Sequence, residues 1–189
     1  MYRETIDGIE LAFDTAEGLF SPRGLDAGTR AMLKIAEFHP EDKVLDLGCG
    51  YGPVGIYAAK KIGPERVTAV DVDPLAVETA RKNAEANGVS GIAFHVSDGF
   101  RSIPDAGYTA ILSNPPYQSD FAVARHFIEK GFNRLALGGR MYMVTKREAW
   151  YKNKFIAIFG GVRVREVDGY YVFTAEKRSF EYANKKKKT

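Results

Sequence analysis

Residues 44–55, VLDLGCGYGPVG, constrain the fold of this chain more than any other stretch. A short apolar run that contains a single acid, Asp46, is followed by three alternating glycines: Gly48, Gly50 and Gly52. Glycine allows left-handed backbone angles and lets another group approach the main chain closely. Pro53 is favourable at the first position of a helix, because its missing N–H costs no hydrogen bond there. The stretch therefore predicts a buried strand, a tight turn and a helix start in immediate succession.

Two patterns of nucleotide-type binding use such a turn. The dinucleotide fingerprint requires glycine at its first, third and sixth positions, and the sixth position counted from Gly48 is Pro53. An acid two residues before the first glycine fits a different pattern better. At this point the sequence resembles the class I S-adenosylmethionine-dependent methyltransferases, whose first motif reads acid, any residue, Gly, any residue, Gly, any residue, Gly. The turn alone is equally compatible with a tight connection that binds nothing.

Length and composition favour one domain. The chain has 189 residues, of which 45% are hydrophobic, enough for one sizeable core. We expect residues 1–184 to form it, with residues 1–40 as an N-terminal hairpin and helix, residues 41–184 as the core, and residues 185–189 as a basic tail. The longest apolar run has about five residues, far below the roughly 20 that span a bilayer, so we expect a soluble, cytoplasmic protein without a membrane partner.

The charge and the single cysteine limit which kinds of binding site the chain can have. The net charge is +3, and without the four consecutive lysines of the tail the chain carries 23 basic and 24 acidic residues. A nucleic-acid footprint would therefore be a local patch rather than a global field. Cys49 is the only cysteine; it predicts a small residue in a turn, with neither a disulfide nor a metal cluster.

Strands and helices alternate along the rest of the chain. Asp7-Gly8 favours a hairpin turn, and Asp26 or Thr29 can cap a helix that runs to about Phe38. After the opening strand and helix, we expect strands at residues 66–72, 91–96, 108–113 and 140–145, helices at residues 75–87 and 149–159, a helix of about 15 residues closed by Gly138-Gly139, and a terminal antiparallel pair at residues 162–168 and 170–176. This order predicts an α/β fold with a mostly parallel, doubly wound sheet, whose ligands bind at the carboxyl ends of its strands.

Acids follow two of these strand ends. Asp71 ends the second core strand, where a carboxylate can accept both hydroxyls of an adenosine ribose. Asp98, followed by Gly99 and Phe100, ends the third; its carboxylate could accept from an adenine amino group, and the Phe100 ring could pack on the base. An ordinary turn aspartate is the alternative for Asp98.

The fourth core strand ends in Asn114-Pro115-Pro116-Tyr117, the most specific signal in the chain. Two prolines cannot continue a strand ladder and hold the main chain extended, which would direct the Asn114 side chain and the Pro115 carbonyl into the crevice. Two acceptors there can bind both hydrogens of a planar amino group and align its nitrogen with a methyl donor. Tyr117 offers a ring face for an unstacked base. A proline-rich loop with a surface aromatic is the alternative.

These residues resemble the amino-methylating branch of the class I methyltransferases. LFSPRGLDAGTR, NPPY followed by a helix, and the closing GYYVF are similar to the "methyltransferase small domain" family, which includes ribosomal RNA guanine exocyclic-amine methyltransferases. The resemblance implies a seven-stranded Rossmann-like sheet with one antiparallel strand, S-adenosylmethionine as cofactor, and catalysis at Asn114 with Pro115 and Tyr117. The expected cofactor-binding residues are Asp46, Gly48, Cys49, Gly50, Gly52, Asp71, Asp98, Gly99, Phe100 and Asn114. Larger members commonly read Phe-His where Tyr117-Gln118 stand.

The expected substrate is guanine N2 in ribosomal RNA or a ribosomal subunit. Besides Tyr117, the candidate substrate-binding residues are cations near predicted strand ends or before the first helix: Arg23, Arg101, Lys146 and Arg147. Merely solvated cations are the alternative, and the three histidines, at positions 39, 95 and 126, are read as structural or exposed. Methylation of a protein glutamine amide or of adenine N6 stays open, as does a non-catalytic RNA-binding or ribosome-assembly module that keeps the cofactor pocket.

Overall fold

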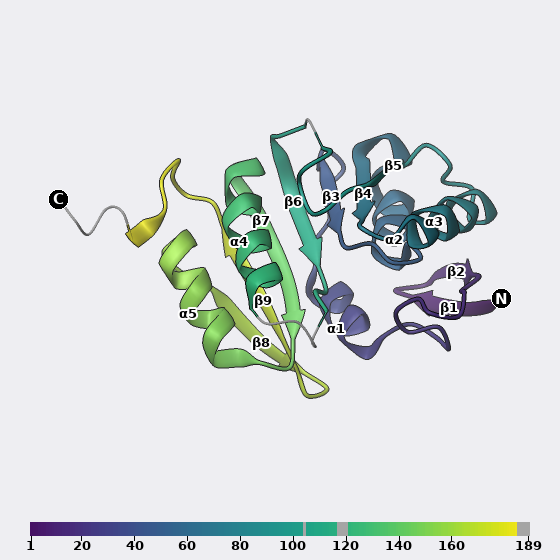
Figure 1. The fold of residues 1–189 in the computed structure, drawn as a ribbon, viewed down its shortest axis with the longest axis horizontal. Coiled ribbons are helices and arrows are strands. Elements are labelled where there is room, and N and C mark those ends of the chain that lie inside the picture. The colour runs from purple at the N-terminus through teal and green to yellow at the C-terminus, as the bar shows by residue number, and fades with distance from the viewer. Residues whose placement is uncertain (104, 117–120, 185–189) are drawn as a thin grey trace.

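A seven-stranded sheet with the order β5-β4-β3-β6-β7-β9-β8 forms the centre of the computed structural model, which describes residues 1–103, 105–116 and 121–184 (Figure 1). Its strands are β3 (Val44–Leu47), β4 (Val67–Asp71), β5 (Ala93–Val96), β6 (Tyr108–Ser113), β7 (Leu135–Thr145), β8 (Arg163–Val167) and β9 (Tyr170–Glu176). Strand β9 runs antiparallel to β7 and β8, and the other pairs are parallel. The predicted doubly wound, mostly parallel sheet with one antiparallel strand is confirmed.

Helices cover both faces of this sheet. One face carries α1 (Ala27–Ile35), α2 (Pro53–Ile62) and α3 (Pro74–Ala86); the other carries α4 (Ala122–Arg134) and α5 (Glu148–Phe159). A 3₁₀ turn, η1 (Pro64–Arg66), connects α2 to β4. Successive side chains of a strand point to opposite faces, so Val44 joins the apolar cluster under α1–α3 while Leu45 and Leu47 join the one under α4 and α5. This arrangement leaves the carboxyl ends of β3, β4 and β6 open at one edge.

The N-terminal hairpin forms as predicted, with β1 (Tyr2–Ile6) pairing with β2 (Ile9–Phe13). Asp7 and Gly8 both have positive φ, as the turn requires. Two asparagines anchor the hairpin, one within α3 and one at its C-terminal cap. The Asn83 side chain accepts from the Asp14 N–H at 2.8 Å, and the Asn87 side chain accepts from the Ala12 N–H at 3.0 Å. The hairpin therefore lies beside α2 and α3, at the end labelled N in Figure 1.

The largest differences from the predicted boundaries are at the end of α1 and between α4 and β7, which begins at Leu135 rather than residue 140. Helix α1 ends at Ile35 rather than Phe38. Helix α4 ends at Arg134, whose guanidinium donates to the carbonyls of Ile103 and Asp105 at 2.8 and 2.6 Å, and the chain enters β7 at once. Gly138 and Gly139 do not close that helix; they lie in an irregular part of β7, where a Cβ on Gly139 would stand 2.9 Å from two carbonyl oxygens. No helix within the described ranges is long and apolar enough to cross a membrane.

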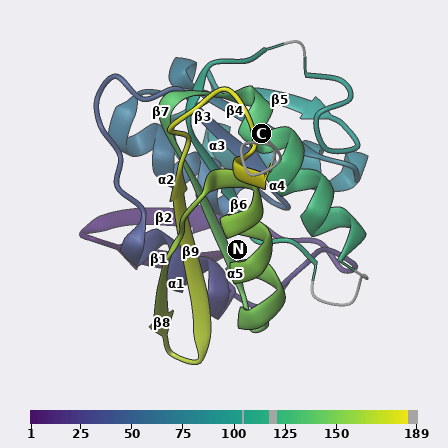
Figure 2. The same ribbon diagram turned by 90° about the vertical axis from the view of Figure 1, so that its left-hand side faces the viewer.

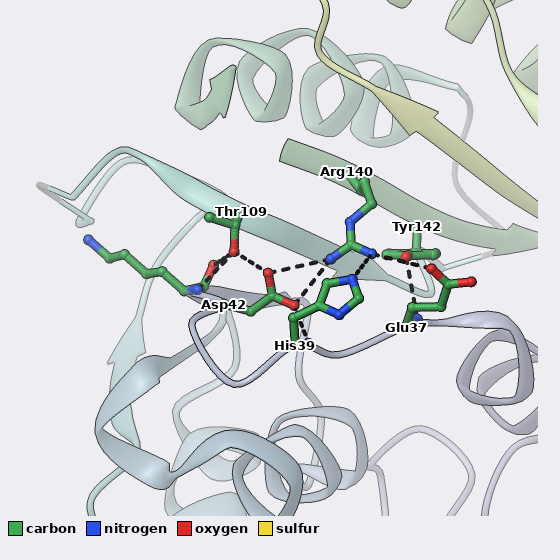
Figure 3. Close-up of polar contacts among 7 residues, drawn as sticks. Glu37, His39, Asp42, Thr109, Arg140 and Tyr142 are labelled. Atoms are coloured by element: carbon green, nitrogen blue, oxygen red, sulfur yellow. Dashed lines mark hydrogen bonds and ion pairs between the residues drawn. The ribbon is translucent and has the colours of Figure 1, made fainter. Parts of the chain in front are cut away.

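A polar network closes the opposite edge of the sheet, away from the strand carboxyl ends (Figure 3). The buried Asp42 carboxylate accepts from the Arg140 guanidinium at 3.1 Å, from the Thr109 hydroxyl at 2.7 Å and from the His39 N–H at 2.7 Å. Arg140 also lies 3.6 Å from the Glu37 carboxylate. These contacts tie the segment between α1 and β3 to the start of β6 and to the middle of β7, so the network supports the fold rather than the cavity.

Candidate active site

A cavity of about 300 Å³ opens at the carboxyl ends of β3, β4, β5 and β6. Its volume lies at the lower end of the range for small-molecule sites. Most of the predicted cofactor residues line it: Asp46, Gly48, Cys49, Gly50, Asp71, Asp98, Gly99 and Asn114. Pro115 lines it as well, and two predicted residues, Gly52 and Phe100, do not.

The glycine turn forms the floor of the cavity. The N–H groups of Gly48 and Cys49 donate to the Val70 carbonyl at 2.9 and 2.8 Å, which holds the turn against β4. Gly50 has a φ of +53°, and a Cβ there would meet no atom within 4 Å, so a side chain would occupy the space above the turn. Gly52 instead allows close helix packing, because it precedes α2 with a φ of +100° and a Cβ would press on Ala80 of α3 at 3.1 Å.

Asp46 lies beneath the turn and is almost completely buried. Its carboxylate accepts from the Gly55 N–H at 2.8 Å, which joins β3 to the first turn of α2. Burial raises the pKa of Asp46 to about 7; the Gly55 hydrogen bond opposes this effect, and the nearby Asp71 carboxylate adds to it. Near neutral pH, the Asp46 side chain is therefore present in both its protonated and its charged form, directly under the cavity.

Asp71 presents a carboxylate whose orientation is held by the backbone. One oxygen accepts from the Gly50 N–H at 2.8 Å and the other from the Asp73 N–H at 3.0 Å. A carboxylate has about four acceptor sites, so further donors from the cavity can bind the same group. This arrangement fits the two hydroxyls of an adenosine ribose, the partner expected for Asp71 from the sequence.

The aromatic ring beside Asp98 comes from a different element than expected. Phe100 is buried under α4, where the Phe127 and His126 rings contact it at centroid distances of 6.5 and 6.2 Å. Phe127 and Val123 of α4 line the cavity instead. The sequence showed Phe127 only as one apolar position of a helix, and the helical spacing did not indicate that part of this face borders a cavity.

Asn114 is clamped by two side chains from the start of α1. Its amide nitrogen donates to the Asp26 carboxylate at 2.8 Å and to the Thr29 hydroxyl at 3.0 Å. The same Asp26 oxygen accepts from the Thr29 N–H at 2.8 Å and so caps the helix. Because an ionised carboxylate only accepts hydrogen bonds, the amide nitrogen must face Asp26 and the amide oxygen must face away. Sequence reasoning identified Asp26 as a helix cap but missed this second contact.

The predicted substrate cations do not form one cluster. Arg23 is exposed and does not line the cavity. Arg101 lies 3.7 Å from the Asp98 carboxylate, in a neighbouring groove along α4. Lys146 and Arg147 follow β7 and stand over the Tyr170 and Phe121 rings. Tyr117, the predicted platform for a base, lies outside the described residues.

Sequence comparison identifies the family. The family described as "Methyltransferase small domain" matches residues 10–174. The chain belongs to this family. Membership confirms the family, the fold class and the S-adenosylmethionine-dependent methyltransferase class predicted from the sequence.

Individual relatives differ in length from this chain. An uncharacterised Bacillus subtilis protein, YbxB, is 30% identical over 89% of this chain and 87% of its own length. Ribosomal RNA small subunit methyltransferase C of Pseudomonas paraeruginosa is 31% identical, over 89% of this chain but 52% of its own length. A structure of the T. thermophilus 16S rRNA N2 G1207 methyltransferase with AdoMet and guanosine superposes with a TM-score of 0.86 at 28% identity, covering 94% of this chain and 50% of that one. The chain thus spans about half the length of these two ribosomal RNA enzymes.

Proposed function

We propose that this methyltransferase modifies an exocyclic amino nitrogen, and that its substrate is guanine N2 in ribosomal RNA, acted on in the cytoplasm. The observation that carries the proposal is the clamped Asn114 at the wall of the cavity, with Pro115 next to it. S-adenosylmethionine supplies the methyl group. The residues of the chain bind it, hold the target nitrogen in line with it and exclude water.

Asn114 and Pro115 suit a planar amino group. Such a group has two hydrogens to donate, and its nitrogen lone pair is delocalised into the ring or carbonyl. The Asn114 amide oxygen and the Pro115 carbonyl are two acceptors on one rigid stretch of chain, and binding both hydrogens fixes the direction of the nitrogen. Rigid placement of this kind lowers the barrier through positioning and electrostatics, because no reorganisation is needed during the reaction.

The other end of the cavity suits the adenosine part of the cofactor. Asp71 would bind the ribose hydroxyls, and Asp98 would accept from the adenine amino group, with Phe127 as the neighbouring ring. The Gly48–Gly50 backbone would lie beneath the amino-acid part, where the absence of a Cβ on Gly50 leaves the necessary space. These roles divide the cavity into a cofactor side at β3–β5 and a target side at Asn114.

The choice of guanine in ribosomal RNA rests on two relatives. The Pseudomonas protein is named as a small-subunit ribosomal RNA methyltransferase, and the T. thermophilus protein as an N2 G1207 methyltransferase of 16S rRNA. Since this chain matches about half of each, the identity of its target nucleotide is part of the proposal. Methylation of adenine N6 or of a glutamine amide would use the same pair of acceptors.

The test is methyl transfer from labelled S-adenosylmethionine to ribosomal RNA isolated from cells without the gene, followed by mass analysis of the nucleosides. We expect N2-methylguanosine from the wild-type protein. Asn114→Ala should lose at least about tenfold in single-turnover rate while it keeps much of its affinity for S-adenosylmethionine, because the contact acts mainly on the target nitrogen. Asn133→Ala is the matched control. Asn133 lies near the C-terminal end of α4, away from the cavity, and its amide donates to the Tyr182 hydroxyl.

Three results would overturn the proposal. Methylated adenine or methylated peptide glutamine, with no N2-methylguanosine, would reassign the substrate. Equal rates for Asn114→Ala and Asn133→Ala would remove Asn114 from the reaction. Cofactor binding without turnover on any RNA or peptide would favour an assembly module.

A further inference from the structure

The order of the sheet separates the two sides of the active site. The residues suited to the cofactor follow β3, β4 and β5, whereas Asn114 follows β6. The next strands along the sheet are β7 and β9, on the side of Asn114 away from the glycine turn. A substrate that reaches Asn114 while the cofactor is bound therefore has the C-terminal end of β7 and the start of β9 beside it.

That side of the sheet edge carries a patch of rings and cations. We call it the aromatic–basic patch and define it as Phe121, Lys146, Arg147, Trp150 and Tyr170. The Phe121 and Trp150 rings are stacked, with centroids 4.3 Å apart and an interplanar angle of 13°. The Arg147 guanidinium stands over Phe121 at 5.3 Å, and the Lys146 ammonium over the Tyr170 ring at 4.9 Å.

The patch draws on three elements that are far apart in the sequence. Phe121 precedes α4, Trp150 belongs to the first turn of α5, and Tyr170 opens β9. Thr145, the last residue of β7, pairs with Tyr171 of β9, which sets Lys146 and Tyr170 at the same end of the sheet. Figure 2 shows the turn of the β8–β9 hairpin and the start of α5 at this same end of the sheet.

The two cations of the patch are exposed, and within the described part of the chain neither makes an ion pair. Other arginines form ion pairs within the protein: Arg30 with Glu4, Arg66 with Glu41 and Arg140 with Asp42. Lys146 and Arg147 are therefore able to bind anions without breaking an ion pair with a described residue, while each keeps its contact with a ring.

Nearby acids are already paired with other cations. Asp168, in the β8–β9 turn, lies 3.5 Å from the Lys34 ammonium, and Glu148 lies 3.6 Å from Lys152. Neither of these two acids therefore forms an ion pair with Lys146 or Arg147. Rings that can stack on bases, interleaved with cations that can contact phosphates, are the features by which proteins bind unpaired nucleotides.

We propose that the aromatic–basic patch binds the unpaired RNA nucleotides that flank the target guanine. Flanking bases stack on the exposed parts of the Phe121–Trp150 pair and on the Arg147 guanidinium, while Lys146 and Arg147 contact phosphates. The inference rests on the proposed function, since it takes RNA as the substrate. It adds where the RNA lies and in which form, as a splayed single strand rather than a duplex.

The only tryptophan of the chain, Trp150, reports on the patch directly. The probe is a single-stranded RNA of about ten nucleotides with one central guanine, a length within the usual site size of stacking proteins. We expect its addition to quench the Trp150 emission, with a midpoint equal to that of RNA binding followed by anisotropy of an end-labelled RNA. The duplex form of the same sequence should bind more weakly and leave the emission unchanged.

Variants distinguish the contribution of base stacking to RNA binding from the contribution of charge. Lys146→Ala and Arg147→Ala should each flatten the slope of log affinity against log salt by about 0.7, the value for one phosphate contact on a single strand. Arg66→Ala is the matched control, because it removes an arginine from the opposite edge of the sheet. Trp150→Leu should weaken RNA binding roughly 5- to 150-fold, the usual cost of losing one stacked base, whereas Trp150→Phe keeps a ring and should weaken it less. Unchanged affinity for S-adenosylmethionine shows that each variant is folded.

The outcomes separate this inference from the proposed function. If guanine is methylated but Lys146→Ala and Arg147→Ala behave like Arg66→Ala, and saturating RNA leaves the Trp150 emission unchanged, the patch is not the RNA contact and the proposed function stands. If RNA binds through the patch but no guanine is methylated, the inference stands and the proposed function fails. If a glutamine-containing peptide quenches Trp150 and the RNA does not, the surface binds protein and the inference is overturned.

Discussion

Replacing Asp26 with serine should slow methyl transfer without uncapping α1. In the structure, one Asp26 oxygen accepts from the Thr29 N–H and from the Asn114 amide, both at 2.8 Å. Serine keeps the cap, since its hydroxyl can accept from Thr29, but its shorter side chain does not reach Asn114. Asp26→Ala removes both contacts. The two variants together separate the cap of α1 from the orientation of Asn114.

The magnitudes follow from the two hydrogen bonds. A bond to a charged group contributes about 1.5–3 kcal/mol, and if this orientation of Asn114 is required in the transition state, the turnover number of Asp26→Ser should fall roughly 10- to 150-fold. The Michaelis constant for S-adenosylmethionine should change much less. Asp26→Ala should lose a similar factor in rate and a further folding stability of about 1 kcal/mol, which is the usual cost of a lost cap.

The assay is single-turnover methyl transfer at saturating cofactor, together with urea unfolding of each variant. Thr29→Val serves as an intermediate case, because it removes only the neutral contact at 3.0 Å. If Asp26→Ser retains turnover within about twofold of the wild type while Asn114→Ala is strongly impaired, the clamp has no role in catalysis. If the rates follow the stabilities across the three variants, the loss is structural.

Further predictions concern three other acids. Asp71→Ala should weaken binding of both S-adenosylmethionine and its demethylated product by about 1–3 kcal/mol, because donors in the cavity lose their acceptor; equal affinities by calorimetry would contradict this role. The raised pKa of Asp46 means that the folded state favours its protonated form. The unfolding free energy of the wild type should therefore fall relative to Asp46→Asn as the pH rises from about 4 to about 7, by at most about 4 kcal/mol, with no further change above that range; parallel pH profiles in urea would refute it. Asp42→Ala should destabilise the fold by about 3–5 kcal/mol, because it leaves Arg140 without its buried partner, whereas loss of the exposed Glu41–Arg66 pair through Glu41→Ala should cost less than about 1 kcal/mol in the same assay.

Local sequence was sufficient to predict the structure where one short stretch contains all the signals that determine it. The strand, glycine turn and helix start at residues 44–55 lie where the spacing predicted them, and β6 has the predicted bounds. The hairpin around Asp7-Gly8 also follows from its own turn residues. In each case hydrophobic period, turn chemistry and capping agree, so few alternatives compete.

The end of α4 shows where local signals conflict. Gly138-Gly139 is a plausible helix stop, and Leu135 continues the apolar spacing of the helix. In the structure Leu135 pairs with Tyr108 instead, and Gly139 allows the chain to pass close to the Tyr108 carbonyl before β7 resumes its register. A sheet partner far upstream in the sequence decided this boundary, and no window around the glycines contains that information.

The sequence by itself determined the family, the α/β class and the acids and glycines at the strand ends that line the cavity, because each of these is encoded in a contiguous motif at the end of one strand. Only the tertiary structure decided which motifs meet. Asp26 reaches Asn114 across 88 residues, Phe127 rather than Phe100 borders the cavity, and Phe121 stacks on Trp150. Such pairs depend on the order of strands in the sheet and on which face each helix covers. A pattern of spacing within one element does not specify either of these, since it gives the direction of a side chain relative to its own helix or strand and not the neighbour it will face.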